Sequence, residues 1–140
     1  MFSLDVFEAI KNRRSIRKYK KKIVEKEKIL KVLEAARLAP SAMNRQPYSF
    51  FVTSDTDIIE RISSACNQQW ETPTIIVAVA FPDKAWVRDD GEEYWKADTS
   101  IAMTTLSLQA VEEGLGTCWI VAFNEIEIKK ILGIANEVVK

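Results

Sequence analysis

One stretch of the sequence carries the residue types that favour an anionic ligand. Seven of the ten residues from Arg13 to Lys22 are positively charged, although the chain as a whole has 20 basic and 20 acidic residues. Arg13, Arg14 and Arg17 are grouped around the hydroxyl of Ser15. Arginine presents a planar fork of donors that suits phosphate, and a serine hydroxyl can add a further hydrogen bond. These four residues therefore predict a phosphate-binding site.

Two other interpretations of the basic run are open. Solvated lysines and cations at a helix C-terminus would account for Lys18 and for residues 20–22. A nucleic-acid patch is the second, but Tyr19 is the one stacking residue in the run and no recognition helix follows. Because the net formal charge is zero, the chain as a whole is not drawn to nucleic acid or to an anionic membrane.

A second polar stretch lies between Pro40 and Pro47. Pro40 should end the preceding helix, because proline lacks an N–H group and restricts the residue before it. Pro47 leads into an aromatic and β-branched segment that is typical of a strand. Ser41, Asn44 and Gln46 would then stand on a stiff connector, where binding groups are often found. An ordinary helix-to-strand turn has the same composition.

The elements that position these stretches follow from hydrophobic periodicity. We predict helices at Leu4–Asn12, Glu25–Leu38, Thr56–Ser64 and Glu125–Leu132, a longer helix capped by Asp98-Thr99-Ser100 and ending near Glu113, strands at Tyr48–Thr53, Thr74–Phe81 and Cys118–Ala122, and the first residues of another strand at Val138–Lys140. The nearly all-apolar Thr74–Phe81 run indicates a central strand buried on both faces. A sheet with helices packed on it predicts an α+β single domain over residues 1–140.

The long helix has apolar or small residues around more than one face. This pattern predicts burial on several sides, which favours a subunit interface as well as a core. The preceding connector, Pro82–Asp98, contains six acids and the aromatic residues Trp86, Tyr94 and Trp95. These aromatic side chains are candidate substrate contacts, or they are tucked into the core.

Residue types and motifs that are missing from the sequence limit the catalytic chemistry that it can support. The sequence has no histidine, which excludes Ser–His–Asp and Cys–His triads, and its two cysteines, Cys66 and Cys118, are far apart, which disfavours a transition-metal site. Its four glycines form neither a dinucleotide fingerprint nor a Walker loop. An enzyme of this composition would depend on a cofactor for the hard chemistry. No apolar run approaches the ~18 residues of a membrane span and no signal peptide is evident, so the cytoplasm is the expected compartment.

Three segments together resemble the FMN-dependent nitroreductase family. They are Arg13-Arg-Ser-Ile-Arg17-x-Tyr19, Ala39-Pro-Ser-Ala-x-Asn44-x-Gln46-Pro47 and Gly114-Leu-Gly-Thr-Cys-Trp-Ile120. Each is weak alone, but in this order they extend over essentially the whole chain. The resemblance implies a nitroreductase-like α+β fold, in which a mixed, mainly antiparallel sheet is flanked by helices and a long central helix is buried. It also implies a homodimer with FMN at the interface.

The resemblance assigns expected roles to named positions. Arg13, Ser15 and Arg17, with Arg14 between them, would hold the FMN phosphate, ribityl chain and pyrimidine edge. The other subunit would contribute Pro40, Ser41, Ala42 and Asn44. The isoalloxazine ring would receive hydrogen bonds from Asn67 and Gln68, and the backbone of Val121, Ala122 and Phe123 would face flavin N5.

The implied activity is a ping-pong hydride transfer. Flavin N5 would accept hydride from NADH or NADPH, and electrons would pass to a nitroaromatic, quinone-like or related acceptor, with no catalytic acid or base from the protein. The alternative is a non-catalytic flavin-binding module or scaffold of the same fold. The family's chains usually continue beyond a residue like Lys140 into another strand and a basic residue that touches the phosphate. We therefore expect weaker FMN binding or an open sheet edge.

Overall fold

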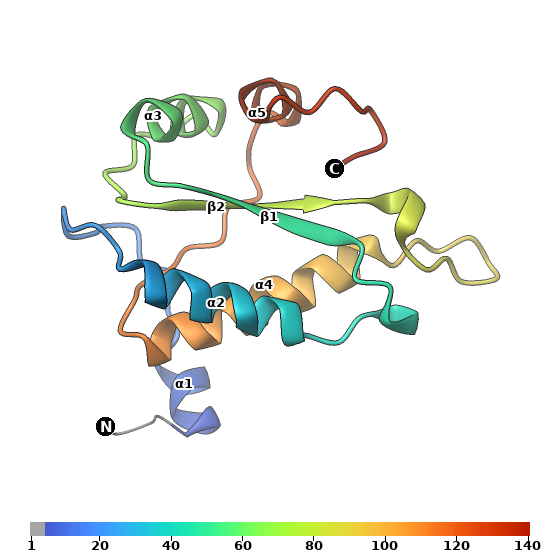
Figure 1. Cartoon of the computed structure of the whole chain (residues 1–140), viewed down its shortest axis with the longest axis horizontal. Coiled ribbons are helices and arrows are strands. Elements are labelled where there is room, and N and C mark those ends of the chain that lie inside the picture. Colours follow the sequence, from blue (N-terminus) through green and yellow to red (C-terminus); the bar gives the residue numbers. More distant parts are fainter. Residues whose placement is uncertain (1–4) are drawn as a thin grey trace.

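The computed structural model describes residues 5–140 and places a small sheet between two layers of helices (Figure 1). Helices α3 and α5 lie on one face of the sheet, and α2 and α4 lie on the other (Figure 1). The helices are α1 (Val6–Asn12), α2 (Lys26–Leu38), α3 (Thr56–Ala65), α4 (Trp95–Glu112) and α5 (Glu125–Leu132); the strands are β1 (Tyr48–Thr53) and β2 (Ile75–Ala80); and two short 3-10 turns are η1 (Ala42–Asn44) and η2 (Pro82–Lys84).

The sheet separates two hydrophobic cores. Strands β1 and β2 pair antiparallel, with Tyr48 opposite Ala80 and Thr53 opposite Ile75. Because side chains alternate between the faces of a strand, neighbouring residues of β2 enter different cores. Ile76 packs with Tyr48 and Phe50 against α2 and α4, whereas Ile75 and Val77 pack against α3 and α5.

Local capping explains where several helices begin and end. Asp55 accepts a hydrogen bond from the Ile58 N–H at 3.0 Å, and Asn124 accepts one from the Glu127 N–H at 3.2 Å. Gly133 ends α5 in the left-handed conformation at φ +69°, which glycine adopts without steric cost. The predictions for α2, α3, α5 and β1 are confirmed to within one residue. The first predicted helix began at Leu4, which lies outside the described residues; Asp5 caps α1 by accepting from the Glu8 N–H.

Helix α4 differs from its prediction in two ways. It begins at Trp95, so Asp98 lies inside the first turn of the helix and is not its cap. Within this chain only one stripe of the helix is buried, formed by Asp98, Ala102, Leu106 and Ala110, and Ile101 is 41% exposed. The single chain therefore shows burial on one side of this helix, and burial of its other sides, which was expected at a subunit interface, stays a prediction.

The sheet is smaller than predicted. Residues 118–122 form no strand, contrary to the prediction, because they pair with neither strand of residues 5–140. Strand β2 is covered on both faces, as predicted, but it is not a central strand of the two-stranded sheet, and only Val79 and Ala80 are buried while its other residues are half-buried. Residues 138–140 are not a strand either, although Lys140 exchanges two backbone hydrogen bonds with Ala80, at 2.6 and 2.9 Å.

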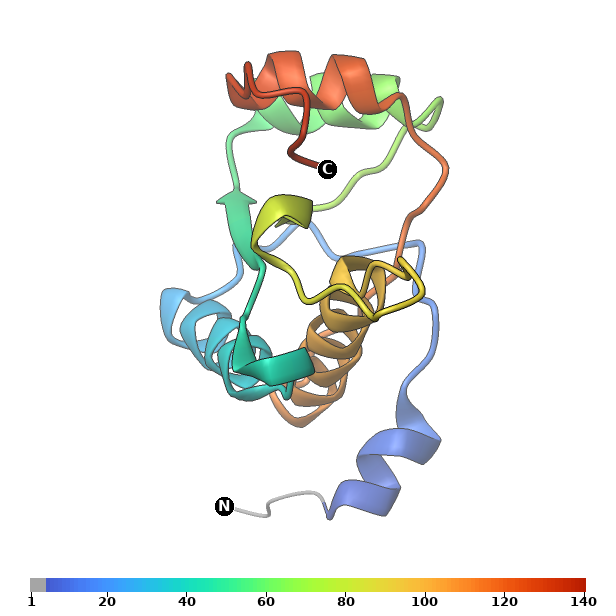
Figure 2. The same ribbon diagram turned by 90° about the vertical axis from the view of Figure 1, so that its right-hand side faces the viewer.

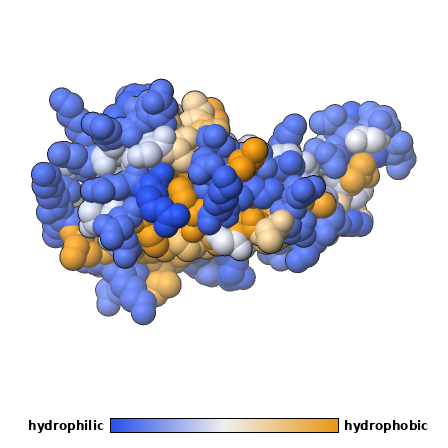
Figure 3. Space-filling view, turned by 90° about the horizontal axis from the view of Figure 1, so that it is seen from above, coloured by the Kyte–Doolittle hydropathy of each residue, from blue (hydrophilic) through white to orange (hydrophobic). Residues whose placement is uncertain are grey.

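The connection between β2 and α4 forms a projecting lobe. Trp86 packs edge-on against Tyr94 with 4.9 Å between ring centroids, and Arg88 pairs with Asp90 at 2.7 Å. When the molecule is viewed from the side of α3 and α5, this lobe is the mainly hydrophilic projection at the right (Figure 3). None of the helices within residues 5–140 is both long and apolar enough to cross a membrane.

Candidate functional site

The basic run is joined to the segment that follows α4. The Ile16 N–H donates to the Thr117 carbonyl at 2.8 Å, and Ser15 and Thr117 form an isolated parallel bridge. Gly116 permits this approach, because a Cβ atom at that position would lie 3.0 Å from three side-chain atoms of Ile16. Two motifs that are 100 residues apart in the sequence are thereby adjacent in the fold.

Two arginines of the cluster carry uncompensated charge. Within residues 5–140, neither Arg13 nor Arg17 makes an ion pair or a side-chain hydrogen bond. By contrast, Arg37 binds Glu34 at 2.6 Å. Arg14 donates to the backbone carbonyls of Lys11 and Arg13. The positive charge of the cluster is consequently available to an anion.

Tyr19 follows the arginine cluster in the sequence, two residues after Arg17. Its hydroxyl donates to the Ile16 carbonyl. Burial raises the pKa of Tyr19, Cys118 acts in the same direction, and Arg17 opposes them. Because an ordinary tyrosine already titrates near pH 10, Tyr19 stays protonated at neutral pH and remains a hydrogen-bond donor.

The loop between Pro40 and Pro47 has an unusual backbone. Met43, Asn44 and Gln46 have φ values of +53°, +53° and +49°. Left-handed conformations cost non-glycine residues on the order of 1 kcal/mol each and persist where the surroundings enforce them. Part of this constraint is internal, since Ser41 accepts at its Oγ from the Gln46 N–H (3.0 Å) and at its carbonyl from the Asn44 N–H (2.9 Å).

Contacts from outside the loop complete the constraint. The Ala42 N–H donates to Asp98 Oδ1 at 2.9 Å, and Arg45 Nη1 donates to the Ala85 carbonyl at 3.1 Å. Pro47 is fully buried. Of the predicted site residues here, Pro40 and Asn44 are exposed and Ser41 and Ala42 are half-buried. Their polar groups are held in a defined geometry at the surface.

One chain does not bring this loop together with the arginine cluster. The loop contacts α4 at Asp98, in its first turn, whereas Thr117 follows its last turn. A helix of 18 residues is about 27 Å long, and the two groups lie at opposite ends of it (Figure 1). A single small ligand could contact both groups only if they came from different chains.

The remaining predicted residues lie near the ends of α3 and α5. Asn67 and Gln68 are exposed directly after α3, and Asn67 has a φ of +52°. Val121, Ala122 and Phe123 are exposed on the connection into α5. The Asn124 N–H donates to the Ala65 carbonyl at 2.8 Å, which brings these two segments to the same edge of the molecule.

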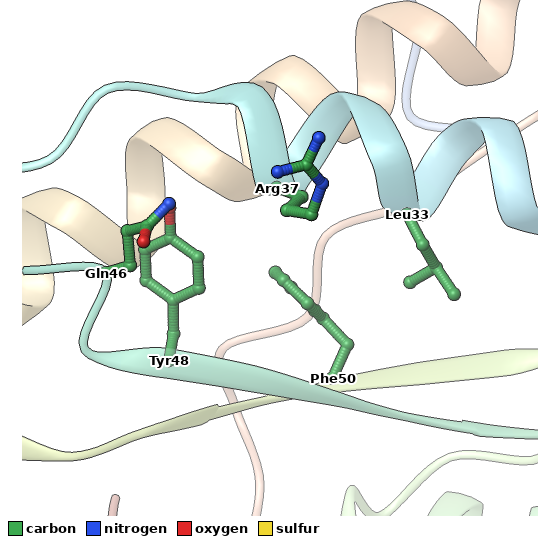
Figure 4. Close-up of a pocket in the computed structure, with 5 residues that line it drawn as sticks. All are labelled: Leu33, Arg37, Gln46, Tyr48 and Phe50. Atoms are coloured by element: carbon green, nitrogen blue, oxygen red, sulfur yellow. The ribbon is translucent and has the colours of Figure 1, made fainter. Parts of the chain in front are cut away.

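A cavity of about 320 Å³ lies between α2 and β1, and none of the residues that the family resemblance assigned to FMN lines it. Leu33 and Arg37 reach it from α2, whereas Tyr48 and Phe50 rise toward it from β1, with Gln46 beside the tip of Tyr48 (Figure 4). Arg37 is already neutralised by Glu34, so the cavity offers no free charge.

Asp98 is a buried acid whose contact with the loop the sequence-based prediction missed. Its side chain is 1% exposed, yet it was predicted as a helix cap. A signal was present in the sequence, because Asp98, Ala102, Leu106 and Ala110 recur every four residues and so share one helix face. An acid in a stripe of small and apolar residues indicates a buried carboxylate with a specific partner.

The family assignment comes from comparison with known proteins. A model of the nitroreductase family matches residues 10–73 and 69–140. The chain belongs to the nitroreductase family. Two archaeal relatives are named, provisionally, NADH dehydrogenase/NAD(P)H nitroreductase. The protein from Methanothermobacter thermautotrophicus is 36% identical over 119 residues, which are 83% of this chain and 60% of that protein. The protein from Archaeoglobus fulgidus is 31% identical over 134 residues, or 93% and 77% of the two chains.

Solved structures agree with this nitroreductase fold. A nitroreductase family protein of Clostridium difficile superposes with a TM-score of 0.89 at 36% identity, over 95% of this chain and 77% of that one. A second C. difficile protein, described as an FMN-dependent nitroreductase, gives 0.82 at 34% identity over 96% and 81%. This member of the nitroreductase family spans 60% to 81% of the length of these four proteins.

Proposed function

We propose that this chain is an FMN-dependent NAD(P)H oxidoreductase whose flavin sites are shared between two identical chains. The observation that carries the proposal is the uncompensated charge of Arg13 and Arg17, held beside Thr117 on a nitroreductase fold. The names of the archaeal relatives and of the C. difficile structure support the choice of reductant and cofactor.

The residues present fit a flavin mononucleotide. Its phosphate would be bound by Arg13, Arg14 and Ser15, because a dianion needs cationic donors and no acid of residues 5–140 neutralises Arg13. Arg17 would lie toward the pyrimidine edge. The isoalloxazine ring would lie against the other predicted residues, all of which are exposed: Asn67, Gln68, Val121, Ala122 and Phe123.

Shared sites explain the separation of the two predicted halves. The loop with Pro40, Ser41, Ala42 and Asn44 would act on the flavin bound by the partner chain. Exposed apolar side chains support such an association. In α1, which stands away from the main body (Figure 2), Val6 and Phe7 are 75% and 66% exposed. A dimer would remove this surface from water.

The reaction proposed is electron transfer from NADH or NADPH to a nitroaromatic, quinone-like or related acceptor. FMN, when bound, would supply the hydride-accepting chemistry. The protein would bind and orient it, and the arginine charges would favour an anionic cofactor. The proposed reaction requires no catalytic acid or base from the protein, which is consistent with a chain that has no histidine.

The visible spectrum of the purified protein tests this proposal. We expect flavin absorbance that bleaches when NADH or NADPH is added without oxygen and returns when an acceptor is supplied. Protein that is yellow and bleaches with dithionite but not with either nucleotide would favour the flavin-binding module. Colourless protein that takes up no added FMN would contradict the proposal and favour a scaffold.

A further inference from the structure

We propose that Asp98 is a positioning residue for the flavin site, because its buried carboxylate fixes the backbone of the Pro40–Pro47 loop and so orients Ser41 and Asn44. This inference rests on the proposed function, in which that loop contacts FMN. Asp98 would not touch the cofactor itself; it would act through the Ala42 N–H that it binds.

The first support is the cost of having an acid at this position. Asp98 is 1% exposed and makes no ion pair with any residue in the described part of the chain. Its Oδ1 accepts from Ala42, and its Oδ2 is buried without a partner. Buried carboxylates are expensive unless they are paired, and an apolar residue would continue the stripe of Ala102 and Leu106 at no such cost. The acid is therefore better explained by the loop than by the core.

The second support is the loop's need for an external constraint. Three of its residues have positive φ values, and its internal hydrogen bonds involve only near neighbours. The Asp98 side chain supplies a contact from outside the loop by accepting from the Ala42 N–H. Ala42 lies between Ser41 and Asn44, the two polar residues assigned to the flavin. Arg45, which binds the Ala85 carbonyl, holds the loop on the far side of Asn44.

The third support is that Asp98 also acts electrostatically on Tyr48, the first residue of β1 after the loop. Tyr48 follows Pro47 directly, and its hydroxyl is buried without a hydrogen-bond partner among residues 5–140. Burial raises the pKa of Tyr48, and the charge of Asp98 raises it further, so the two groups are electrostatic neighbours. In Figure 4 the tip of Tyr48 lies beside Gln46, the last left-handed residue of the loop. One carboxylate thus binds the loop at Ala42 and also acts electrostatically on Tyr48, the residue that follows Pro47.

The test uses three variants of the full chain. Asp98→Ala removes the acceptor, Asp98→Asn retains a carbonyl oxygen for the Ala42 N–H, and Leu106→Ala weakens the same face of α4 two turns away. Hydrogen exchange of residues 41–46 is measured without flavin, and the FMN dissociation constant is measured by fluorescence quenching. We expect Asp98→Ala to speed loop exchange and weaken FMN binding by about tenfold or more, with Asp98→Asn intermediate.

The control separates positioning from general stability. Leu106→Ala should lower the melting temperature while leaving loop exchange and FMN affinity within about twofold of the parent. Unchanged loop exchange in Asp98→Ala would overturn the inference, as would equal losses of FMN affinity in Asp98→Ala and Leu106→Ala. If the parent chain binds no FMN, the proposed function fails, yet the exchange measurement still decides whether Asp98 holds the loop.

Discussion

Arg13 and Arg17 of the basic run differ from Arg37 and Arg88 in what surrounds them. Arg37 and Arg88 each have a carboxylate within 2.7 Å, so their charges are already neutralised locally. Arg13 and Arg17 have no such partner in the described chain. An exposed ion pair contributes little to stability, but an uncompensated guanidinium next to a bound phosphate contributes directly to affinity.

Replacing Arg17 with alanine should weaken FMN binding by about tenfold or more, because one charge-assisted interaction is lost. The loss should be larger at low salt than at high salt, since screening reduces the contribution of the charge in the parent. Arg88→Ala is the matched control and should leave the FMN dissociation constant unchanged. Fluorescence titrations at two salt concentrations measure both effects. An unchanged dissociation constant in Arg17→Ala would remove this residue from the proposed site.

The two cysteines should differ in their reaction with alkylating agents. Cys66 is buried and its pKa is raised by that burial, so less of it is thiolate at any given pH. Cys118 is only half-buried. A short iodoacetamide pulse at pH 8 should therefore label Cys118 well before Cys66, as read by peptide mass spectrometry. Equal labelling of the two in folded protein would show that Cys66 is not shielded as the structure indicates.

At the scale of elements, the site depends on a single crossing between two irregular segments. The Ser15–Thr117 bridge attaches the basic run to the connection that follows α4, and Gly116 makes room for Ile16 at that crossing. Neither segment belongs to a helix or strand. The position of the arginines therefore depends on close backbone approach more than on regular secondary structure.

Gly116→Ala should disturb this crossing. The new methyl group would meet Ile16 at 3.0 Å, and a β-branched side chain has little freedom to move away. We expect a loss of about 1–2 kcal/mol in the free energy of unfolding, measured by urea denaturation, with weaker FMN binding. Adding Ile16→Ala removes two of the three atoms in conflict, Cγ1 and Cγ2, so the double variant should be more stable than additivity predicts. Strict additivity would contradict the crossing seen here.

Local signals were sufficient for most of the elements. Asp55, Asn124 and Gly133 mark helix ends by short-range chemistry, and β1 begins just after Pro47, as its composition suggested. The sequence did not predict features that depend on contacts between residues far apart in the chain. Residues 118–122 have strand-forming side chains, but no strand of residues 5–140 pairs with them. Asp98 resembled a cap because its burial against Ala42 depends on tertiary structure. The three motifs could be recognised in the sequence, but the sequence did not show which of them are adjacent in the fold.

At the scale of the whole molecule, α4 determines how the two halves of the site are arranged. It carries the Pro40–Pro47 loop at its first turn and leads to the arginine cluster after its last. If both halves bind one flavin, each site takes its arginines from one chain and its loop from the other. The stoichiometry of mixed dimers can then reveal which chain supplies each half.

Complementation between two defective chains tests this arrangement. The first variant, Arg13→Ala with Arg17→Ala, lacks the phosphate-binding charges; the second, Ser41→Ala with Asn44→Ala, lacks the polar loop groups. Each variant alone should bind little FMN. A mixed dimer, isolated with two different affinity tags, contains one site with intact arginines from one chain and an intact loop from the other, and one site with both defects. It should bind one FMN per dimer, against two for the parent, as measured from flavin absorbance. Mixed dimers without flavin would contradict the shared site, because a site within a single chain would be defective in both partners.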